Sequence, residues 1–327
     1  MQLSLTRQTP AASILLMLLL VAAAFTRFAI APYGDELIAG GAALPGVWVD
    51  AFQSKYPAWG VVFSALMVAA VATSLGRITS ALGLYHVRTT ISIPLYAVVA
   101  CGIFIASDSL AVALSAYFAG QMLRYLYGGY VRGTDLNCAF YAGLCAALAP
   151  LFYAPTLPFV VLIPIAIVMF GLSMREIVVM LVGLILPIAT ICYVSWLCGA
   201  DFAAPAVGLF EATLSPNGYT PWGSESVVAL TMMGLLLFLV VCGIAAFVGD
   251  TRSVAMRPRT ILVFNIIVFI VACTSFMLPS ATTGLMMLVA LPMAVLMPVA
   301  LLRLRDGVSN LIVTVLILLM IIHFFIA

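Results

Sequence analysis

Two adjacent carboxylates are the clearest candidates for chemistry in this sequence of 327 residues. Asp35 and Glu36 follow the first long apolar run, in the stretch FAIAPYGDELIAGG. Neighbouring carboxylates can bind a divalent cation, or one of them can accept a proton as a general base. Two solvated acids in a surface loop would give the same pattern. Asp50 could join the pair if the loop after the first apolar run folds back on itself.

Two arginines lie near the ends of apolar runs. Arg27 lies about two turns before the end of the first run, a depth at which an unpaired charge is costly. It could bind phosphate at the membrane surface, or it could snorkel outward or pair with Asp35 or Glu36. Arg124, in AYFAGQMLRYLYGGYVRG, has tyrosines around it and is typical of an interface anchor.

A later polar stretch, residues 199–226, combines acidic, aromatic and proline residues. Glu211, Tyr219 and Trp222 could line a substrate groove, or they could be ordinary loop residues at the level of the interfacial aromatic belt. No Walker P-loop and no CxxC pair is present, so neither an ATP-driven pump acting alone nor a cysteine metal site has support. No basic stripe indicates nucleic-acid binding.

The elements that must position these residues follow from the composition. Hydrophobic residues make up 65% of the chain and charged residues only 7%, against roughly 25% charged in a soluble domain. Long continuous apolar stretches, such as residues 227–249, favour membrane-spanning helices over barrel strands, which would alternate over roughly ten residues. The sequence therefore predicts one all-α domain over residues 1–327, a polytopic transmembrane helix bundle whose surroundings are the lipid bilayer.

About eleven apolar windows approach the roughly 20-residue length that crosses a bilayer. We expect spans at residues 11–33, 59–76, 90–106, 109–127, 138–153, 157–172, 177–198, 227–249, 261–278, 283–302 and 309–326. The windows at 138–153 and 157–172 are short and contain prolines, so they could be kinked or re-entrant. The first outer loop, residues 34–58, predicts a short amphipathic helix at the interface.

The distribution of charge predicts the orientation, because cytoplasmic loops carry an excess of Lys and Arg. With a cytoplasmic N-terminus, only Arg27 and Lys55 of the 13 basic residues fall on the outer side. Most acidic residues fall on that outer side. We expect a multi-pass protein of the bacterial inner membrane with an uncleaved first span, a cytoplasmic N-terminus and a periplasmic or external C-terminus.

Two stretches resemble the GT-C class of membrane glycosyltransferases, which use lipid-linked sugar donors. Asp35 and Glu36 occupy the first outer loop, where that class places a catalytic acidic pair or single Asp. The run FYAGLCAALAPLFYAP at 140–155 resembles the small-residue helix of the class. Gly143 matches, but Ala147 replaces the second glycine and the lysine often found in the turn is absent.

The resemblance covers roughly a third of the chain. The stretch 137–187, with its Arg175–Glu176 turn and its Gly183–Pro187 pattern, also looks like bacterial multi-pass membrane proteins without an assigned activity.

The resemblance implies transfer of a sugar, or a related group, from a polyprenyl-phosphate donor at the outer face of the membrane. Asp35 or Glu36 would act as the general base or hold a divalent cation, and Arg27 would meet the donor phosphate. The remaining substrate contacts would come from Asp50, Glu211, Tyr219 and Trp222.

Two other classes remain open from the sequence. One is a non-enzymatic subunit or scaffold of a cell-envelope complex, which would pack against a membrane protein partner. The other is a secondary transporter, which the scarcity of polar residues at mid-span disfavours, although the proline-containing windows at 138–172 keep it under consideration.

Overall fold

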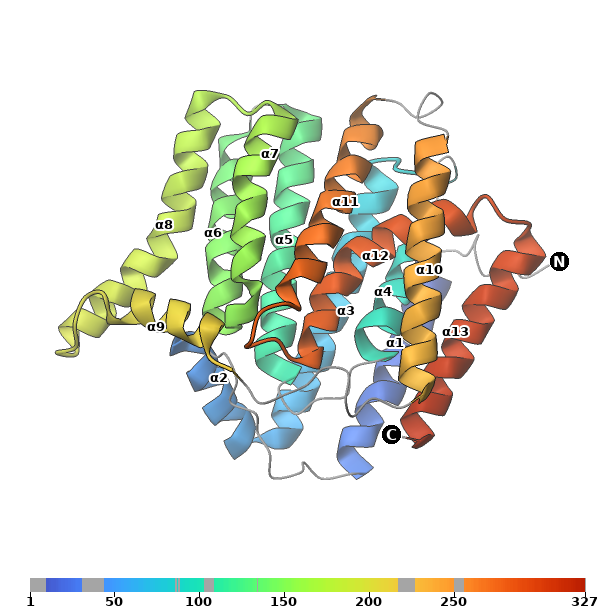
Figure 1. The fold of residues 1–327 in the computed structure, drawn as a ribbon, viewed down its shortest axis with the longest axis horizontal. Helices are drawn as coiled ribbons and strands as arrows, with labels where there is room; N and C mark the ends of the chain where they lie inside the picture. Colours follow the sequence, from blue (N-terminus) through green and yellow to red (C-terminus); the bar gives the residue numbers. More distant parts are fainter. Residues whose placement is uncertain are drawn as a thin grey trace.

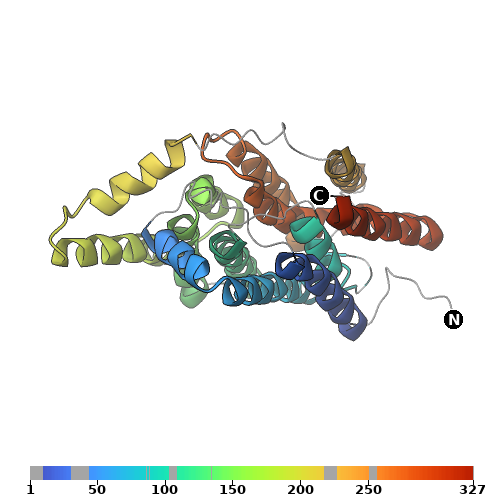
Figure 2. The same ribbon diagram turned by 90° about the horizontal axis from the view of Figure 1, so that it is seen from below.

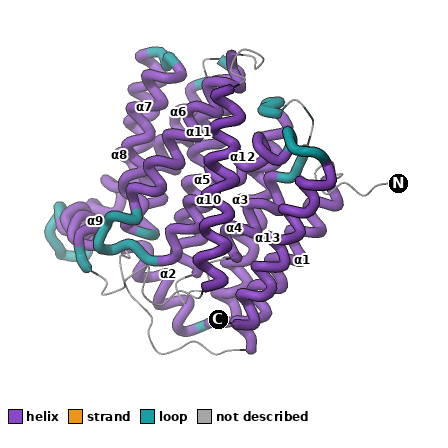
Figure 3. Tube along the Cα trace, turned by 45° about the vertical axis from the view of Figure 1, so that its right-hand side comes forward, coloured by secondary structure: helices purple, strands orange, loops and turns teal. Residues whose placement is uncertain are grey.

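The computed structural model describes residues 10–30, 44–85, 87, 89–102, 109–133, 135–216, 227–249 and 256–326, and every regular element within these ranges is a helix (Figures 1 and 3). The first half contains α1 (Pro10–Ile30), α2 (Leu44–Lys55), α3 (Pro57–Ala81), α4 (Ser92–Gly102), α5 (Ser109–Arg132), α6 (Leu136–Phe152), η2 (Ala154–Val161) and α7 (Leu162–Phe170). The second half contains α8 (Met174–Leu197), α9 (Ala204–Leu214), α10 (Val227–Gly249), α11 (Met256–Ser275), η3 (Thr283–Leu285), α12 (Met286–Leu301) and α13 (Asp306–Ile326). The predicted all-α class is confirmed for the described residues.

Each of the eleven apolar windows contains a helix, but the described helices differ in length. Six are long and apolar enough to cross a membrane: α3, α8, α10, α11, η3 with α12, and α13. Helix α4 has only 11 residues, about 16 Å, so by itself it covers roughly half of the hydrocarbon core. Helix α2 falls inside the loop 34–58 that was predicted to be helical, and α9 adds a helix within the loop 199–226.

The two short proline-containing windows form a helical hairpin. Helix α6 ends where Tyr153 takes an extended conformation, and Pro155 then lies in the first turn of the 3-10 helix η2. Gly171 ends α7 with φ of 63°, a left-handed conformation that glycine adopts without strain. Ser173 then begins α8 with a capping box, in which its hydroxyl accepts from the backbone N–H of Glu176.

Helices α6 and α8 approach so closely that their backbones touch. A Cβ atom placed on Gly143 would overlap the carbonyl oxygen of Met180, and one placed on Gly183 would overlap the carbonyl oxygen of Phe140. Both glycines therefore lie at the crossing point, where the missing side chains let the helices meet, as small residues do in membrane helix pairs. This contact is the main attachment of α8, whose remaining surface is largely exposed.

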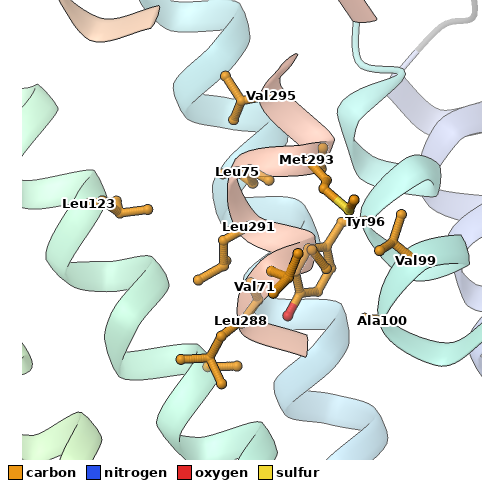
Figure 4. Packing of buried hydrophobic residues seen from close by; sticks show 14 of the residues in the cluster. Val71, Leu75, Tyr96, Val99, Ala100, Leu123, Leu288, Leu291, Met293 and Val295 are labelled. Atoms are coloured by element: carbon orange, nitrogen blue, oxygen red, sulfur yellow. The ribbon is translucent and has the colours of Figure 1, made fainter. Parts of the chain in front are cut away.

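The core of the bundle surrounds α12, which is buried along nearly its whole length and contacts α3, α4, α5, α10 and α11. Figure 4 shows α12 between α5 and α4: Leu288 and Leu291 point toward the side of α5, where Leu123 lies, and Met293 points toward α4. Two tyrosines tie this helix to the N-terminal half: the Tyr96 hydroxyl donates to the Met287 carbonyl at 3.3 Å, and the Tyr85 hydroxyl donates to the Val295 carbonyl at 2.8 Å.

Two helices project from one edge of the bundle. Seen from below, α8 and α9 form a V whose tip, at the α8–α9 turn, points away from the other helices (Figure 2). Helix α9 lies across the lower end of the bundle close to α2, and the α7–α8 turn lies at the upper end (Figure 1). The two ends of the molecule therefore carry different sets of candidate residues.

Candidate functional site

The structure describes the side chains of two of the predicted site residues, Asp50 and Glu211. Arg27 belongs to α1, but its side chain lies outside the described residues, as do Asp35 and Glu36. Tyr219 and Trp222 also lie outside them. The predicted roles of these five residues stay predictions.

Asp50 lies on α2, at the lower end of the bundle, and its carboxylate is half-buried. Burial raises the pKa of Asp50 from 3.8 to about 6. Asp50 forms no hydrogen bond or ion pair within the described part of the chain, so nothing there offsets the loss of solvent. A desolvated carboxylate with a pKa near neutrality is the kind of group that serves as a general base.

Buried contacts of α2 hold Asp50 in this place. The side chain of Gln53 is buried, and its Oε1 accepts a hydrogen bond at 3.2 Å from the backbone N–H of Leu110, at the start of α5. Gly60 of α3 leaves room for Gln53, because a Cβ atom there would lie 2.8 Å from Gln53 Cγ. Helix α2 thus packs against α3, α5 and α6, with the aromatic side chains of Trp48 and Trp59 exposed beside it.

Glu211 lies on α9, which is anchored at the same end of the bundle. Leu209 packs against Leu151 and Ala154 at the α6–η2 turn, and the Ser280 hydroxyl donates to the Thr213 carbonyl at 2.7 Å. Glu211 itself is exposed.

Helices α2 and α9 touch, so the fold brings Asp50 and Glu211 to one end of the molecule.

No group of three His, Cys, Asp or Glu side chains among the described residues is arranged to hold a metal ion. The divalent cation predicted for Asp35 and Glu36 falls on residues outside the described ranges and stays a prediction.

At the opposite end, three arginines line one pocket of about 380 Å³ between α3, α5 and the start of α6. Arg77 comes from α3, whereas Arg124 and Arg132 come from α5. Their side chains are exposed to solvent at the mouth of the pocket. The volume falls within the roughly 300–1,000 Å³ of small-molecule sites.

The acidic residue beside this pocket is largely engaged elsewhere. Asp135 lies 3.9 Å from Arg132, but its carboxylate caps the start of α6 by accepting from the backbone N–H groups of Asn137 and Cys138 at 3.1 and 3.2 Å. The Cys138 thiol also donates to it at 3.2 Å. These hydrogen bonds, first of all the one from the Cys138 thiol, hold the pKa of Asp135 below its usual value.

The sequence pointed to Arg124 as an interface anchor and gave no sign of the pocket. Arg124 and Arg132 share one helix, but Arg77 lies 47 positions before Arg124, and only the packing of α3 on α5 brings it to the same place. A tertiary contact of this kind leaves no spacing pattern in the sequence.

Two glycines that carried part of the two resemblances have a structural explanation. Gly143, in the small-residue run, and Gly183, in the Gly183–Pro187 pattern, are the two residues at the α6–α8 crossing. Their presence follows from helix packing, so they do not argue for any particular chemistry.

One polar pair lies in the interior of the bundle. Asn265 of α11 donates to the carbonyl of Ile261 in its own helix at 2.9 Å, rather than to a neighbouring helix. Its side chain lies near the Tyr127 hydroxyl. Both Asn265 Oδ1 and the Tyr127 hydroxyl are buried without a hydrogen-bond partner among the described residues.

Comparison with known protein families gives a match to a family model. The model of the DUF6427 family, a family of unknown function, matches residues 47–327. Neither a curated protein nor a solved structure matches the chain. Asp50, Glu211 and the three pocket arginines fall inside the matched residues, whereas Arg27, Asp35 and Glu36 precede them.

Proposed function

The chain belongs to the DUF6427 family, and we propose that it is an eleven-span protein of the bacterial inner membrane that transfers a sugar, or a related group, from a polyprenyl-phosphate donor at the outer face. The observation that carries the proposal is Asp50, a half-buried carboxylate without a described partner and with a pKa of about 6. It lies on the side of the membrane that the charge distribution assigns to the exterior.

The proposed orientation places the lower end of Figure 1 outside the cell. This end contains α2, α9 and the C-terminal end of α13. It also contains the exposed Trp48 of α2 and Trp59 of α3. Exposed tryptophans favour the level of the lipid headgroups. The three pocket arginines lie at the other end, as cytoplasmic residues would. Reporter fusions at Asp250 and Ala327 should therefore report opposite sides, and the same side for both would refute the eleven-span topology.

The proposed chemistry assigns the proton transfer to Asp50. The acceptor hydroxyl gives its proton to the Asp50 carboxylate while its oxygen bonds to the anomeric carbon of the sugar. The bond between that carbon and the phosphate oxygen breaks, and polyprenyl phosphate leaves with the electron pair. Arg27 would stabilise the charge that develops on this phosphate. Asp35 and Glu36 are the alternative bases.

The test uses purified protein in proteoliposomes with polyprenyl-phosphate donors that carry carbon-14-labelled hexoses or pentoses. Membranes from a strain that lacks the gene supply the acceptor, and released polyprenyl phosphate is measured. We expect Asp50→Asn to lower the rate by at least about 100-fold. Asp201→Asn, which removes an exposed outer carboxylate, is the matched control.

The outcomes separate the candidate bases. Loss of activity in the Asp35→Ala, Glu36→Ala double variant but not in Asp50→Asn would move the base to the earlier pair. A wild-type protein that turns over no donor in the series would overturn the enzyme proposal and leave the envelope scaffold as the simplest alternative.

A secondary transporter is the second candidate, because the short buried helix α4 meets the proline-containing helix α12 at the centre of the bundle. Helices α4 and α12 contain Pro94, Pro292 and Pro298, and they contact each other. Short proline-interrupted helices at the midplane are typical of transporter binding sites. Substrate-dependent uptake by the same proteoliposomes, without release of polyprenyl phosphate, would favour this class.

A further inference from the structure

We propose that the pocket lined by Arg77, Arg124 and Arg132 binds a phosphate-bearing ligand, either the headgroup of an anionic lipid or a soluble phosphate ester. This site is at the opposite end of the bundle from Asp50, and the proposal does not depend on the enzymatic activity proposed above.

The first argument is the balance of charge. Three guanidinium groups face one pocket, and Asp135 is the one described carboxylate that forms an ion pair with any of them. Three positive charges and one negative charge leave two positive charges uncompensated, which corresponds to the charge of a phosphate monoester. Because Asp135 is held ionised by its capping hydrogen bonds, this balance does not change near neutral pH.

The second argument is that the arginines keep hydrogen-bond donors free for a ligand. The Arg77 side chain forms no hydrogen bond within the described residues. Arg124 uses one nitrogen to donate to Gln121 Oε1 at 3.3 Å, and its guanidinium lies 5.9 Å from the centre of the Tyr125 ring. These contacts hold the Arg124 plane in place and leave its other N–H groups available, since a guanidinium carries five donors.

The third argument is the surrounding helix ends. The backbone carbonyl of Val131, in the last turn of α5 at the pocket wall, accepts a hydrogen bond from Arg257 of α11 at 3.2 Å. This contact satisfies a carbonyl that would otherwise repel an anion. Tyr125 and Gly128 complete a pocket wall that is partly apolar. A lipid headgroup site needs such a wall where the headgroup joins the acyl chains.

A simple interface anchor explains each arginine singly but not their convergence. Anchoring arginines reach separately toward the headgroups around the perimeter of a bundle. Here residues from two helices face one concave space, and arginine forks suit the bidentate recognition of phosphate. The site therefore binds one phosphate group in a defined position.

The test uses the full-length protein in phosphatidylcholine nanodiscs and two probes with the same headgroup. Short-chain phosphatidic acid carries phosphate on a lipid, and glycerol 3-phosphate carries it without acyl chains. Binding is measured by thermophoresis at fixed ionic strength, because salt screens exposed charges. The pocket variant is the Arg77→Ala, Arg124→Ala double variant, and the control is Arg259→Ala with Arg305→Ala, which removes two exposed arginines outside the pocket.

We expect the pocket variant to bind at least about 10-fold more weakly and the control to stay within about two-fold. Binding of phosphatidic acid alone would identify a lipid headgroup site, and binding of both probes would identify a site for soluble phosphate esters. If the alanine variant does not fold, the Arg77→Lys, Arg124→Lys double variant is used instead. It keeps both positive charges but removes the paired N–H donors of the guanidinium groups, so it should still weaken binding. Absence of binding by the wild-type protein, or equal weakening in pocket and control variants, would overturn the proposal.

Discussion

The crossing of α6 and α8 allows a sharp test of the fold, because a single methyl group cannot be accommodated there. In Gly143→Ala the new Cβ would overlap the Met180 carbonyl oxygen and lie 3.0 Å from Met180 C and 3.1 Å from Leu184 N. These are backbone atoms, which cannot rotate away as a side chain could, so the two helices must separate.

The expected magnitude combines two opposing effects. Overpacking costs about 1–3 kcal/mol, and the rigid backbone at this contact places Gly143→Ala near the upper limit. Alanine favours a helix over glycine by about 1 kcal/mol. The net loss is about 2 kcal/mol, which corresponds to a Tm lowered by roughly 4 °C in a protein of this size.

The assay is thermal unfolding in detergent, monitored by a thiol-specific dye that reacts with cysteines as unfolding exposes them. Four of the seven cysteines are buried in the folded protein. The matched control is Gly234→Ala on α10, where the same methyl group meets open space, and its Tm should stay constant or rise by about 2 °C. Gly183→Ala should behave like Gly143→Ala, and the double variant should lose less than the sum, because both changes separate the same pair. A Gly143→Ala protein at least as stable as the wild type would refute this account of the crossing.

Two further predictions concern single carboxylates. Because burial raises the pKa of Asp50 to about 6 in the folded protein against 3.8 when unfolded, its contribution to stability is fully present below about pH 4 and is lost as the pH rises through 6. This pKa shift corresponds to at most about 3 kcal/mol of stability, which partial exposure reduces to about 1–2 kcal/mol. Asp50→Asn should therefore raise the Tm at pH 7 by about 2–4 °C and flatten the dependence of Tm on pH, whereas Asp201→Asn should do neither. An Asp50→Asn protein with an unchanged pH profile would contradict the buried environment of Asp50. The Glu176 carboxylate is buried and accepts hydrogen bonds from the Ser173 N–H at 2.8 Å and from the Ser173 hydroxyl at 2.7 Å. Glu176→Ala should therefore lower the stability by about 1–3 kcal/mol in the same unfolding assay. A loss no greater than that of Glu211→Ala, at an exposed position, would count against the capping box.

The helical architecture could be predicted from the sequence because long apolar runs leave few alternatives in a bilayer. Every apolar window contains a helix, and α2 lies in the loop expected to be helical. The helices that lie within the loops were harder to predict from the sequence. Helix α9 escaped prediction because Pro205 and Pro216, which suggested a loop, lie in its first turn and beyond its end, where a helix tolerates them.

The candidate sites could be predicted only in part. Asp50 was named from its place in the first outer loop, but its half-buried state depends on Gln53 reaching the start of α5, a contact across 57 residues. The arginine pocket was missed for the same reason, since its walls come from helices that are separate in sequence. In both cases the residue types were visible, and the tertiary packing that gives them a shared environment was not.

The central position of α12 has a consequence for how the chain is made. Tyr85 and Tyr96 find carbonyl acceptors in α12 about 190–210 positions later, so the helices synthesised first expose an unfilled groove and two hydroxyls that lack these acceptors until α12 leaves the ribosome. During that interval the nascent protein depends on lipid or on an insertase to cover the groove. A chain truncated before Met286 should therefore be a substrate for membrane quality-control proteases, whereas one truncated after Leu301 should retain its α4–α12 contact and persist longer.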